Sequence, residues 1–497
     1  MAFWGKARRA SGPPASPEVG FGAAAYARLA ERIERAAEVA AARGTPVIAS
    51  VTVPLDPAID PISRIEVAAA NGGHWSAFAQ PARNEFSLAT FEVARQIGVG
   101  ASSRFESIAR ATGEALDGAL ADDLFDDPTA PPGAGIVWTG GFAFLSADSY
   151  ADTWRDFGAA QFVLPRASIV RSGGDQPQAR LTLNVAVHSS AAIGDELAGI
   201  EQLVDRLELD EPHEAPAFVP KAGEVAVTSV SAAEHFERAV AQAAEEIRDG
   251  VYEKVVLARE VVLRRQQAID PFNAVRGLTE RFPECTTFAV SEGSTIFLGA
   301  SPELLVRREG RRASTMALAG SMRRGADPET DAHLSSQLMT SAKNRSEHDI
   351  VVKRIEKVLG RFSAWVSAPE SPEVVKMKNI QHLATPIRAQ LTEPRPVIEL
   401  AGALHPTPAV GGEPWEATRD RIRALEGFDR GWYTGAVGWM DLFEDGEFHV
   451  ALRSALIDGP QARLFAGCGI VGDSDPAAEL AETETKLQAL LPVLSRS

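Results

Sequence analysis

The sequence predicts an α+β fold that is rich in antiparallel strands. In the second half, short strand-like stretches follow one another, separated by turn pairs such as Glu292-Gly293 and Glu309-Gly310, which is typical of hairpins. Helix and strand patterns are interleaved irregularly, without the strict alternation of a doubly wound parallel sheet. The sequence contains no P-loop, G-x-G-x-x-G fingerprint or internal repeat, so it gives no sign of a nucleotide-binding or repeat architecture.

Composition limits the classes of partner. The chain has 497 residues, of which 45% are hydrophobic, so it can bury a large core. Its formal net charge of −17 argues against nucleic acid or an anionic membrane as a partner. Cys285 and Cys468 are the only cysteines, which favours a reducing compartment over a disulfide framework. With neither a signal peptide nor a long apolar run in the sequence, we expect a soluble cytoplasmic protein.

The first half begins with a segment of low complexity. Residues 1–20 are rich in Pro, Ser, Gly and Ala, and we expect them to be disordered. A helix is predicted at 26–43 from its Ala, Glu and Arg content. Strands are predicted at 46–55, 135–145, 160–171 and 179–188.

A compositional break divides the chain. The stretch 208–226 combines three prolines with mixed charge, so we predict an N-terminal half at 21–226 and a catalytic domain at 227–497. Ser231 and Glu234 have the spacing of a capping box, which predicts a helix that ends near Gly250.

The second half alternates between hairpins and two helical regions. A helical stretch is predicted from about 328 to 361, with a break near 344–346, and a further helix is predicted near the C-terminus. The predicted strands lie at 254–263, 286–291, 295–301, 303–308, 313–320, 431–443, 447–457 and 462–471.

Two acidic pairs lie at predicted helix starts. Glu479 and Glu482, three residues apart, share one helix face, and Glu347 and Asp349 lie in the other helical region. Such carboxylates can simply favour the helix dipole, and Glu482 can pair with Lys486 four residues on. Alternatively, two helices that each offer a glutamate can hold Mg²⁺, which binds few protein carboxylates and keeps several waters. Sequence spacing leaves both interpretations open.

Three further charged residues lie in apolar stretches. Lys254 is either an edge lysine or a desolvated amine suited to act as a general base. Glu303 follows a turn of small residues and is either a surface glutamate or, if buried, a proton donor. Arg453 has apolar neighbours, so it either forms a structural ion pair or binds a carboxylate.

A set of motifs occurs in fixed order in the second half of the chain. The motifs are "EKVVLAR", "FLGASPELLVR", "LAGSMRRG", "SAKNRSEHDIVV", "QHLATPIRAQL", "LHPTPAVGGEP", "RGWYTGAVGWMD", "EFHVALRSALI" and "LFAGCGIVGDSDPAAELAET". Together they resemble the chorismate-utilising enzymes, which include anthranilate synthase component I. The resemblance extends over about 228–491 and is strongest to isochorismate synthases of the menaquinone type; the N-terminal half resembles the family mainly through "GIVWTGGFAF".

The resemblance implies a fold and a reaction. The fold is a layered α/β/β/α sandwich, in which two large, mostly antiparallel sheets enclose the active site. The reaction is the isomerisation of chorismate to isochorismate by attack of water at C2 and loss of the C4 hydroxyl. It would serve menaquinone or siderophore biosynthesis and would need no glutamine amidotransferase subunit.

The resemblance also implies roles for individual residues. Lys254 would be the general base and Glu303 the general acid. Mg²⁺ would be held by Glu347 and Glu482 directly, by Glu479 through a water, and by the ring carboxylate of the substrate. One departure is Asn344, where relatives often carry an aspartate. Substrate contacts would come from Arg453 and Tyr433 to the enolpyruvyl carboxylate, and from the backbone of Gly320, Ser321, Gly467 and Gly469.

Other members of the family make different products. Anthranilate-type relatives tend to carry glutamine at the position of Lys254, and aminodeoxychorismate synthases carry a nucleophilic lysine where this chain has Ala319-Gly320-Ser321. The residues present therefore favour water as the nucleophile. A salicylate synthase, which goes on to eliminate pyruvate, and a catalytically inactive relative that binds chorismate are the alternatives.

Overall fold

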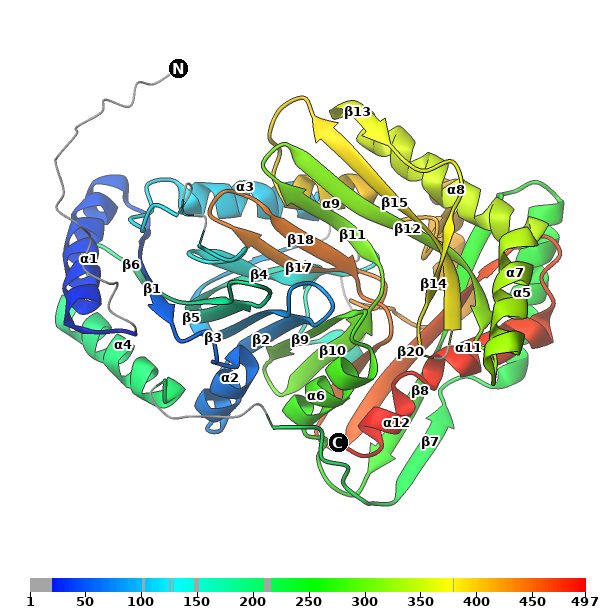
Figure 1. Cartoon of the computed structure of the whole chain (residues 1–497), viewed down its shortest axis with the longest axis horizontal. Coiled ribbons are helices and arrows are strands. Elements are labelled where there is room, and N and C mark those ends of the chain that lie inside the picture. Colours follow the sequence, from blue (N-terminus) through cyan, green and yellow to red (C-terminus); the bar gives the residue numbers. More distant parts are fainter. Residues whose placement is uncertain are drawn as a thin grey trace.

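The computed structural model describes residues 20–100, 103–124, 127, 129–146, 152–209, 216–378 and 380–497. Nearly all of the predicted disordered segment, residues 1–19, lies outside this part of the chain. All pairings between the named strands are antiparallel, as predicted, and hydrogen bonds join these 20 described strands into one network (Figure 1). The α+β class is therefore confirmed.

The network divides into two arms at one strand. β5 (Ala160–Ser172) pairs along one edge with β3 (Phe86–Val99). Its other edge pairs first with β4 (Val137–Phe142) and then with β6 (Gln178–Val187). The first arm starts at β3 and the second at β4, so the two predicted sheets are two arms that β5 connects.

The strands of each arm follow in hydrogen-bonded order. The first arm continues from β3 through β2 (Trp75–Gln80), β9 (Thr286–Glu292), β10 (Thr295–Ser301), β19 (Ser454–Asp458), β20 (Gln461–Ile470) and β8 (Lys254–Arg265). The edge of β8 opposite β20 pairs with β7 (Val225–Ser229) and β16 (Gly412–Glu413). The second continues from β4 through β17 (Ala436–Asp441), β18 (Gly446–Val450), β11 (Leu304–Glu309), β12 (Arg312–Arg323) and β15 (Ile380–Leu391), which pairs with β13 (Ser363–Ser367) and β14 (Glu373–Lys376). β1 (Val47–Leu55) pairs with β6.

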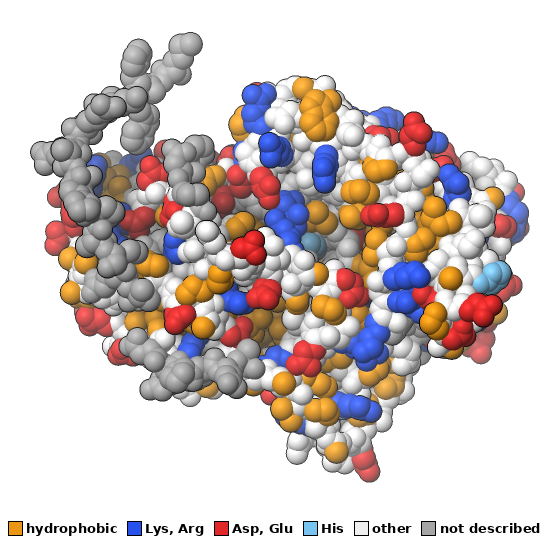
Figure 2. Space-filling view, viewed as in Figure 1, with side chains coloured by type: hydrophobic (Ala, Val, Ile, Leu, Met, Phe, Trp, Pro, Cys, Tyr) orange, Lys and Arg blue, Asp and Glu red, His pale blue; other side chains and the backbone are white. Residues whose placement is uncertain are grey.

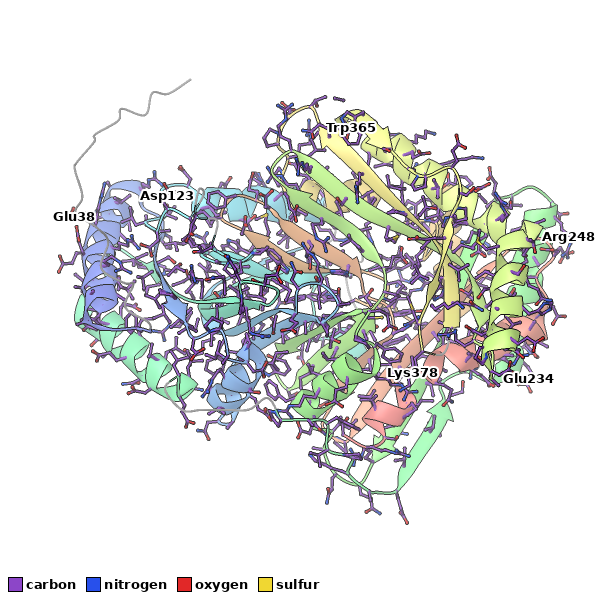
Figure 3. The ribbon with its side chains drawn as sticks, viewed as in Figure 1. Glu38, Asp123, Glu234, Arg248, Trp365 and Lys378 are labelled. Carbon is purple, nitrogen blue, oxygen red and sulfur yellow. The ribbon has the colours of Figure 1, made fainter. Side chains whose placement is uncertain are left out.

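Helices cover the outer face of each arm. On the first arm and its extension to β1 lie α1 (Ala23–Arg43), α2 (Pro61–Ala69), α4 (Ile193–Leu207), α5 (Ala233–Arg248), α6 (Pro271–Arg281), α10 (Trp415–Glu426), α11 (Pro476–Leu487) and α12 (Leu491–Leu494). On the second arm lie α3 (Arg104–Leu116), α7 (Pro328–Thr340), α8 (Ala342–Leu359) and α9 (Val397–Leu404). Side chains at the two ends of the long axis, such as Glu38 on α1 and Arg248 on α5, point outward (Figure 3).

An aromatic core fills the space between the arms. Phe78 and Phe288 of the first arm pack with Trp439 of the second, and Trp154 of the short 3₁₀ helix Asp152–Trp154 stacks on Phe465. Separate clusters lie between each arm and its helices. Burial of apolar side chains on both sides of each arm produces the predicted α/β/β/α layers, because a sheet must cover its hydrophobic faces. Acidic and basic side chains are interspersed over the face shown in Figure 2.

The predicted halves share hydrogen bonds. β2 pairs with β9, and β4 pairs with β17, so strands from before and after residue 226 lie side by side in both arms. The division at 226 stays a prediction. No helix in the described ranges is long and apolar enough to cross a membrane.

Three local predictions are wrong. α5 begins after Ala232, which makes no side-chain cap, so Ser231 lies outside the helix and forms no capping box. The break between α7 and α8 falls at Ser341 instead of 344–346, because the Ser341 side chain accepts from Asn344 N and caps α8 there. The predicted strand 447–457 is interrupted before Ser454, since Arg453 adopts a left-handed φ of 47°.

A buried ion pair joins three segments beside β8. Arg430 donates from Nε to both carboxylate oxygens of Glu426, the last residue of α10, at 3.1 and 3.0 Å. Its Nη atoms also donate to the carbonyls of Val256 and Val410, each at 2.9 Å, and Glu426 accepts from Ala258 N at 2.7 Å. Both side chains are almost fully buried. The pair therefore fixes β8 against the loop that precedes β16.

Removing this cation is expected to destabilise the fold. Arg430→Met keeps an unbranched side chain but leaves the Glu426 carboxylate buried without its partner, which costs about 3–5 kcal/mol of unfolding free energy. Thermal unfolding followed by circular dichroism measures the loss. Arg419→Met, an exposed α10 residue paired with Asp420, is the control and should change stability by less than about 0.5 kcal/mol. Equal midpoints for the two variants would contradict the structural role.

Candidate active site

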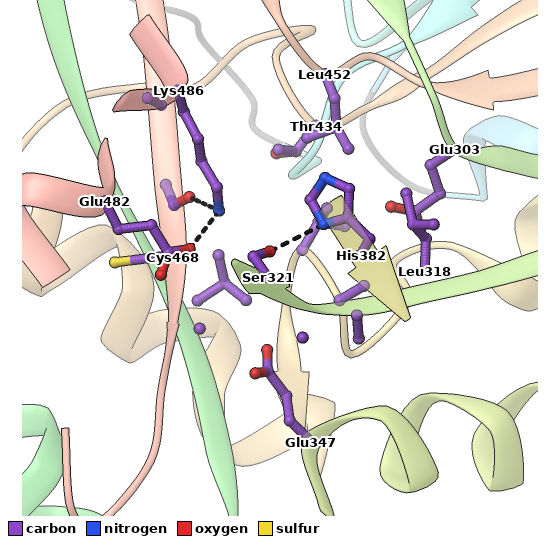
Figure 4. Close-up of a pocket in the computed structure, with 18 of the residues that line it drawn as sticks. Glu303, Leu318, Ser321, Glu347, His382, Thr434, Leu452, Cys468, Glu482 and Lys486 are labelled. Carbon is purple, nitrogen blue, oxygen red and sulfur yellow. Dashed lines mark hydrogen bonds and ion pairs between the residues drawn. The ribbon is translucent and has the colours of Figure 1, made fainter. Parts of the chain in front are cut away.

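A cavity lies between the far ends of the two arms (Figure 4). Its walls come from β8 and β20 of the first arm, from β12 and β15 of the second, and from α8 and α11. It encloses about 980 Å³, open solvent at its mouth included. Ten of the eleven predicted site residues line it: Glu303, Gly320, Ser321, Glu347, Tyr433, Arg453, Gly467, Gly469, Glu479 and Glu482.

The eleventh residue, Lys254, lies just behind the cavity wall. It is the first residue of β8 and is fully buried. Its Nζ lies 2.8 Å from Glu347 Oε1, which is its only ion-pair partner among the described residues. Lys254 is therefore a buried, ion-paired lysine and not a snorkelling edge lysine.

Glu347 lies in the second turn of α8, not at its start as predicted, because α8 begins at Ala342. Burial acts to raise the pKa of its carboxyl, but Lys254, followed by Lys486 and Lys343, outweighs burial and leaves the pKa below its ordinary value. Glu347 is therefore an ionised carboxylate on the cavity wall, with α8 supplying the link between the second arm and β8.

Glu303 has a carboxyl group with a raised pKa, in contrast to Glu347. It lies between β10 and β11 and is only 3% exposed, so the surface interpretation is excluded. Its backbone N donates to Ser301 Oγ at 3.2 Å, and its Oε1 accepts from Thr407 Oγ1 at 3.2 Å. Burial raises the pKa of the carboxyl to about 8, although Thr407 and Lys254 oppose this. At neutral pH Glu303 is thus protonated and able to donate a proton into the cavity.

Glu479 and Glu482 project from one face of α11. The helix starts at Pro476, after Asp475 caps it by accepting from Ala478 N. The predicted pair of Glu482 with Lys486 is confirmed at 2.8 Å, and Lys486 also donates to Gly467 O at 2.8 Å. Glu479 pairs with Lys343 of α8 at 3.3 Å. Each of the three predicted metal ligands therefore forms an ion pair with a lysine.

The donor chemistry of these carboxylates fits a hard cation, although they are not gathered around one point. Among the residues described, no group of three or more His, Cys, Asp or Glu side chains is placed to hold a metal ion. Mg²⁺ needs only one or two protein carboxylates, with waters and substrate oxygens completing its shell. Glu347, Glu479 and Glu482 line the same cavity and offer such oxygens.

Arg453 presents a buried cation without a carboxylate partner in the described part of the chain. Its guanidinium contacts Met377 Sδ at 2.8 Å, Cys285 Sγ at 3.6 Å and His382 Nε2 at 3.4 Å. Burial lowers the pKa of the guanidinium, but an arginine stays charged in proteins. The sequence left a structural ion pair or anion binding open. No such ion pair is found among the described residues, and anion binding stays a prediction.

Glycine at 469 allows the lysine–glutamate pair to approach β20. A Cβ at this position would lie 2.5 Å from Glu347 Oε1 and 3.0 Å from Lys254 Cε, closer than real contacts. At Gly320, a φ of 74° favours glycine directly, and a Cβ would lie 3.1 Å from that of Asn344. Both glycines therefore shape the cavity, whatever contacts their backbones make with a substrate.

Several cavity residues were not predicted from the sequence. His382 on β15 contacts Ser321 Oγ through Nδ1 at 2.9 Å, and burial lowers its pKa well below its ordinary value, so it is neutral. A histidine within the motif "QHLATPIRAQL" was a signal that could have found it. Lys343 gave no comparable signal, because its partner Glu479 is remote in the sequence. Tyr433, which was predicted, stacks on Phe465, and burial raises its pKa to about 12.

Comparisons with known proteins agree with this architecture. Residues 32–495 match the family model of the chorismate-binding enzymes. The chain is 39% identical over 375 residues to a salicylate biosynthesis isochorismate synthase of Pseudomonas aeruginosa, covering 76% of each chain. It is 36% identical to the isochorismate synthase MenF of Bacillus subtilis, covering 72% of this chain and 75% of the relative.

A solved structure shows the same fold. The menaquinone-specific isochorismate synthase MenF from Escherichia coli superposes with a TM-score of 0.72 at 26% identity, covering 93% of this chain and all of that one. The match spans both arms and the cavity between them. From its sequence and its architecture alike, the chain belongs to the family of chorismate-binding enzymes, within the group of the isochorismate synthases.

Proposed function

We propose that this enzyme converts chorismate to isochorismate and depends on Mg²⁺. The observation that carries the proposal is one cavity that combines a neutral, buried acid at Glu303, a lysine–carboxylate pair at Lys254 and Glu347, and an arginine available for an anion at Arg453. The relatives' names support it, since they are isochorismate synthases.

The charges of the cavity favour a divalent cation with a dianionic substrate. Lys343, Arg453 and Lys486 on its wall equal in number the glutamates Glu347, Glu479 and Glu482, and Glu303 is neutral. Chorismate would add two negative charges, and Lys254, which must be neutral to act as the base, does not offset them. A bound Mg²⁺ would supply the missing positive charge and polarise the ring carboxylate of the substrate. Glu347 and Glu482 would hold it directly, and Glu479 through a water.

In this proposal the chain's own residues bind the substrate and move the protons. Arg453 and Tyr433 hold the enolpyruvyl carboxylate, and the backbone of Gly320, Ser321, Gly467 and Gly469 contacts the rest of the substrate. Lys254, once it has released its proton and separated from Glu347, is a neutral amine that takes a proton from the water whose oxygen forms the bond to C2. The double bonds shift, and the C4–O bond breaks as Glu303 donates its proton to the departing hydroxyl. After turnover, the proton gained by Lys254 is returned to Glu303 through solvent. One water enters and one leaves, so the net reaction is an isomerisation.

The pathway is part of the proposal. A relative named for salicylate biosynthesis and a solved structure described as menaquinone-specific are both similar to this chain, so isochorismate would serve menaquinone or siderophore synthesis. A cytoplasmic location is proposed as well, with which the free thiols of Cys285 and Cys468 are compatible.

Product analysis tests the activity. Purified protein incubated with chorismate and Mg²⁺ is expected to form isochorismate alone, resolved by chromatography, and a chelator should abolish the reaction until Mg²⁺ is restored. Salicylate with pyruvate would instead indicate a salicylate synthase. Absence of turnover would indicate an inactive chorismate-binding relative, and either result would overturn the proposal.

Removal of the Lys254 amine should lower turnover but leave chorismate binding intact. Lys254→Ala is expected to lower kcat by at least about 100-fold, because general-base catalysis supplies about that much. Calorimetry should still detect Mg²⁺-dependent binding of chorismate. Lys353→Ala, on the exposed side of α8, is the control and should keep full activity. Rates like those of the wild type in Lys254→Ala would refute its role.

The proposed role of Glu303 as the general acid predicts that activity falls at high pH. Glu303 must be protonated to donate, so kcat/KM should fall as pH rises through about 8, where its carboxyl loses the proton. The fall should approach tenfold per pH unit, measured with chorismate at concentrations far below KM. Activity that stays constant to about pH 9.5 would show that Glu303 is not the acid.

A further inference from the structure

The carboxyl group of Glu303 has one side-chain hydrogen bond within the described residues. Thr407 Oγ1 lies 3.2 Å from Oε1, and Glu303 forms no ion pair in the same ranges. A buried carboxylic acid carries its proton on one oxygen only, and which oxygen carries it decides whether the proton can reach the cavity. The partner of Oε1 therefore bears directly on proton donation.

Thr407 is itself held firmly. It is 4% exposed and lies in the loop between α9 and β16. Its carbonyl accepts from Val410 N at 3.1 Å and Gly411 N at 2.9 Å, which closes the loop into a tight turn. Gly411 O in turn accepts from Val256 N at 2.7 Å, so the turn is tied to β8 two residues from Lys254. The loop thus connects the strand of the base to the side chain of the acid.

We infer that Thr407 is a positioning residue for Glu303: its hydroxyl donates to Oε1 and so keeps the transferable proton on Oε2. The inference deepens the proposed function and rests on it, since it assigns the control of the acid in that reaction. A hydroxyl that donates to one carboxyl oxygen makes that oxygen the carbonyl end, and the proton then resides on the other.

Substitution of Thr407 by valine or serine removes and adds no charged group near Glu303. Lys254 on β8 is the charged group that lowers the pKa of Glu303, in addition to the Thr407 hydroxyl. His405 lies two residues before Thr407, and His449 on β18 lies opposite Leu304. Glu347 and Arg453 lie on the same cavity. Burial lowers the pKa of His405 to about 3, so it stays neutral over the range of interest. The effect of substituting Thr407 on Glu303 therefore measures the loss of the hydrogen bond from Thr407 Oγ1 to Glu303 Oε1.

Two variants test the inference by kinetics. Thr407→Val keeps the shape and removes the donor, and is expected to lower kcat about tenfold or more with KM within about twofold. Because the hydroxyl lowers the pKa of Glu303, its loss should also move the basic limb of the pH profile upward. Thr407→Ser retains a hydroxyl and should keep kcat within about threefold and the limb in place. A Thr407→Val enzyme with the wild-type kcat and limb would overturn the inference.

Infrared spectroscopy tests the hydrogen bond without turnover. The carbonyl stretching band of protonated Glu303 is identified by subtracting the spectrum of Glu303→Gln from that of the wild type. It should move to higher frequency in Thr407→Val and stay in place in Thr407→Ser, because only the former loses donation to the carbonyl oxygen. An unmoved band in Thr407→Val would overturn the inference even if chorismate is turned over. A moved band in a protein that does not act on chorismate would instead refute the proposed function alone.

Discussion

Ion pairs across the cavity between the two arms are the contacts on which the site depends. Lys254 of β8 and Glu479 of α11 belong to the first arm, and both pair with α8, which packs on the second. Because α8 carries Glu347 and Lys343 one turn apart, a single helix links both arms at the level of the cavity. These pairs therefore help to fix the spacing of the charged residues of the two arms.

Burial then gives chemically similar side chains different protonation states. Glu303 and Glu347 both line the cavity, but only Glu347 has an ammonium within 3 Å. Burial without an ion pair makes Glu303 a neutral acid, whereas burial with one keeps Glu347 ionised. The same fold therefore provides a neutral carboxylic acid and an ionised carboxylate from two glutamates. The Arg430–Glu426 pair beside β8 holds the loop that contains Thr407 against β8, the strand that contains Lys254.

The sequence predicted the class of fold and most of the cavity, for identifiable reasons. Alternating strands and turn pairs indicated antiparallel hairpins, and ten predicted site residues line one cavity. The i,i+4 pair of Glu482 and Lys486 was also visible, because helical geometry fixes it locally. Contacts between remote segments were not: nothing near Lys343 indicates Glu479, and nothing near Thr407 indicates Glu303. The start of α5 and the break at Ser341 were misplaced, since caps depend on single hydrogen bonds.

What unites these features is the claim that a solvent water is activated beside Lys254 while Glu303 releases the substrate's own hydroxyl. The fate of oxygen tests it most directly. Turnover of chorismate in H₂¹⁸O, followed by mass spectrometry of the product, should give isochorismate with one ¹⁸O in the C2 hydroxyl. The oxygen of the original C4 hydroxyl should be absent from the product. Isochorismate that carries the original C4 oxygen would show that the hydroxyl migrates within the substrate, and would contradict the division of roles between the lysine and the glutamic acid.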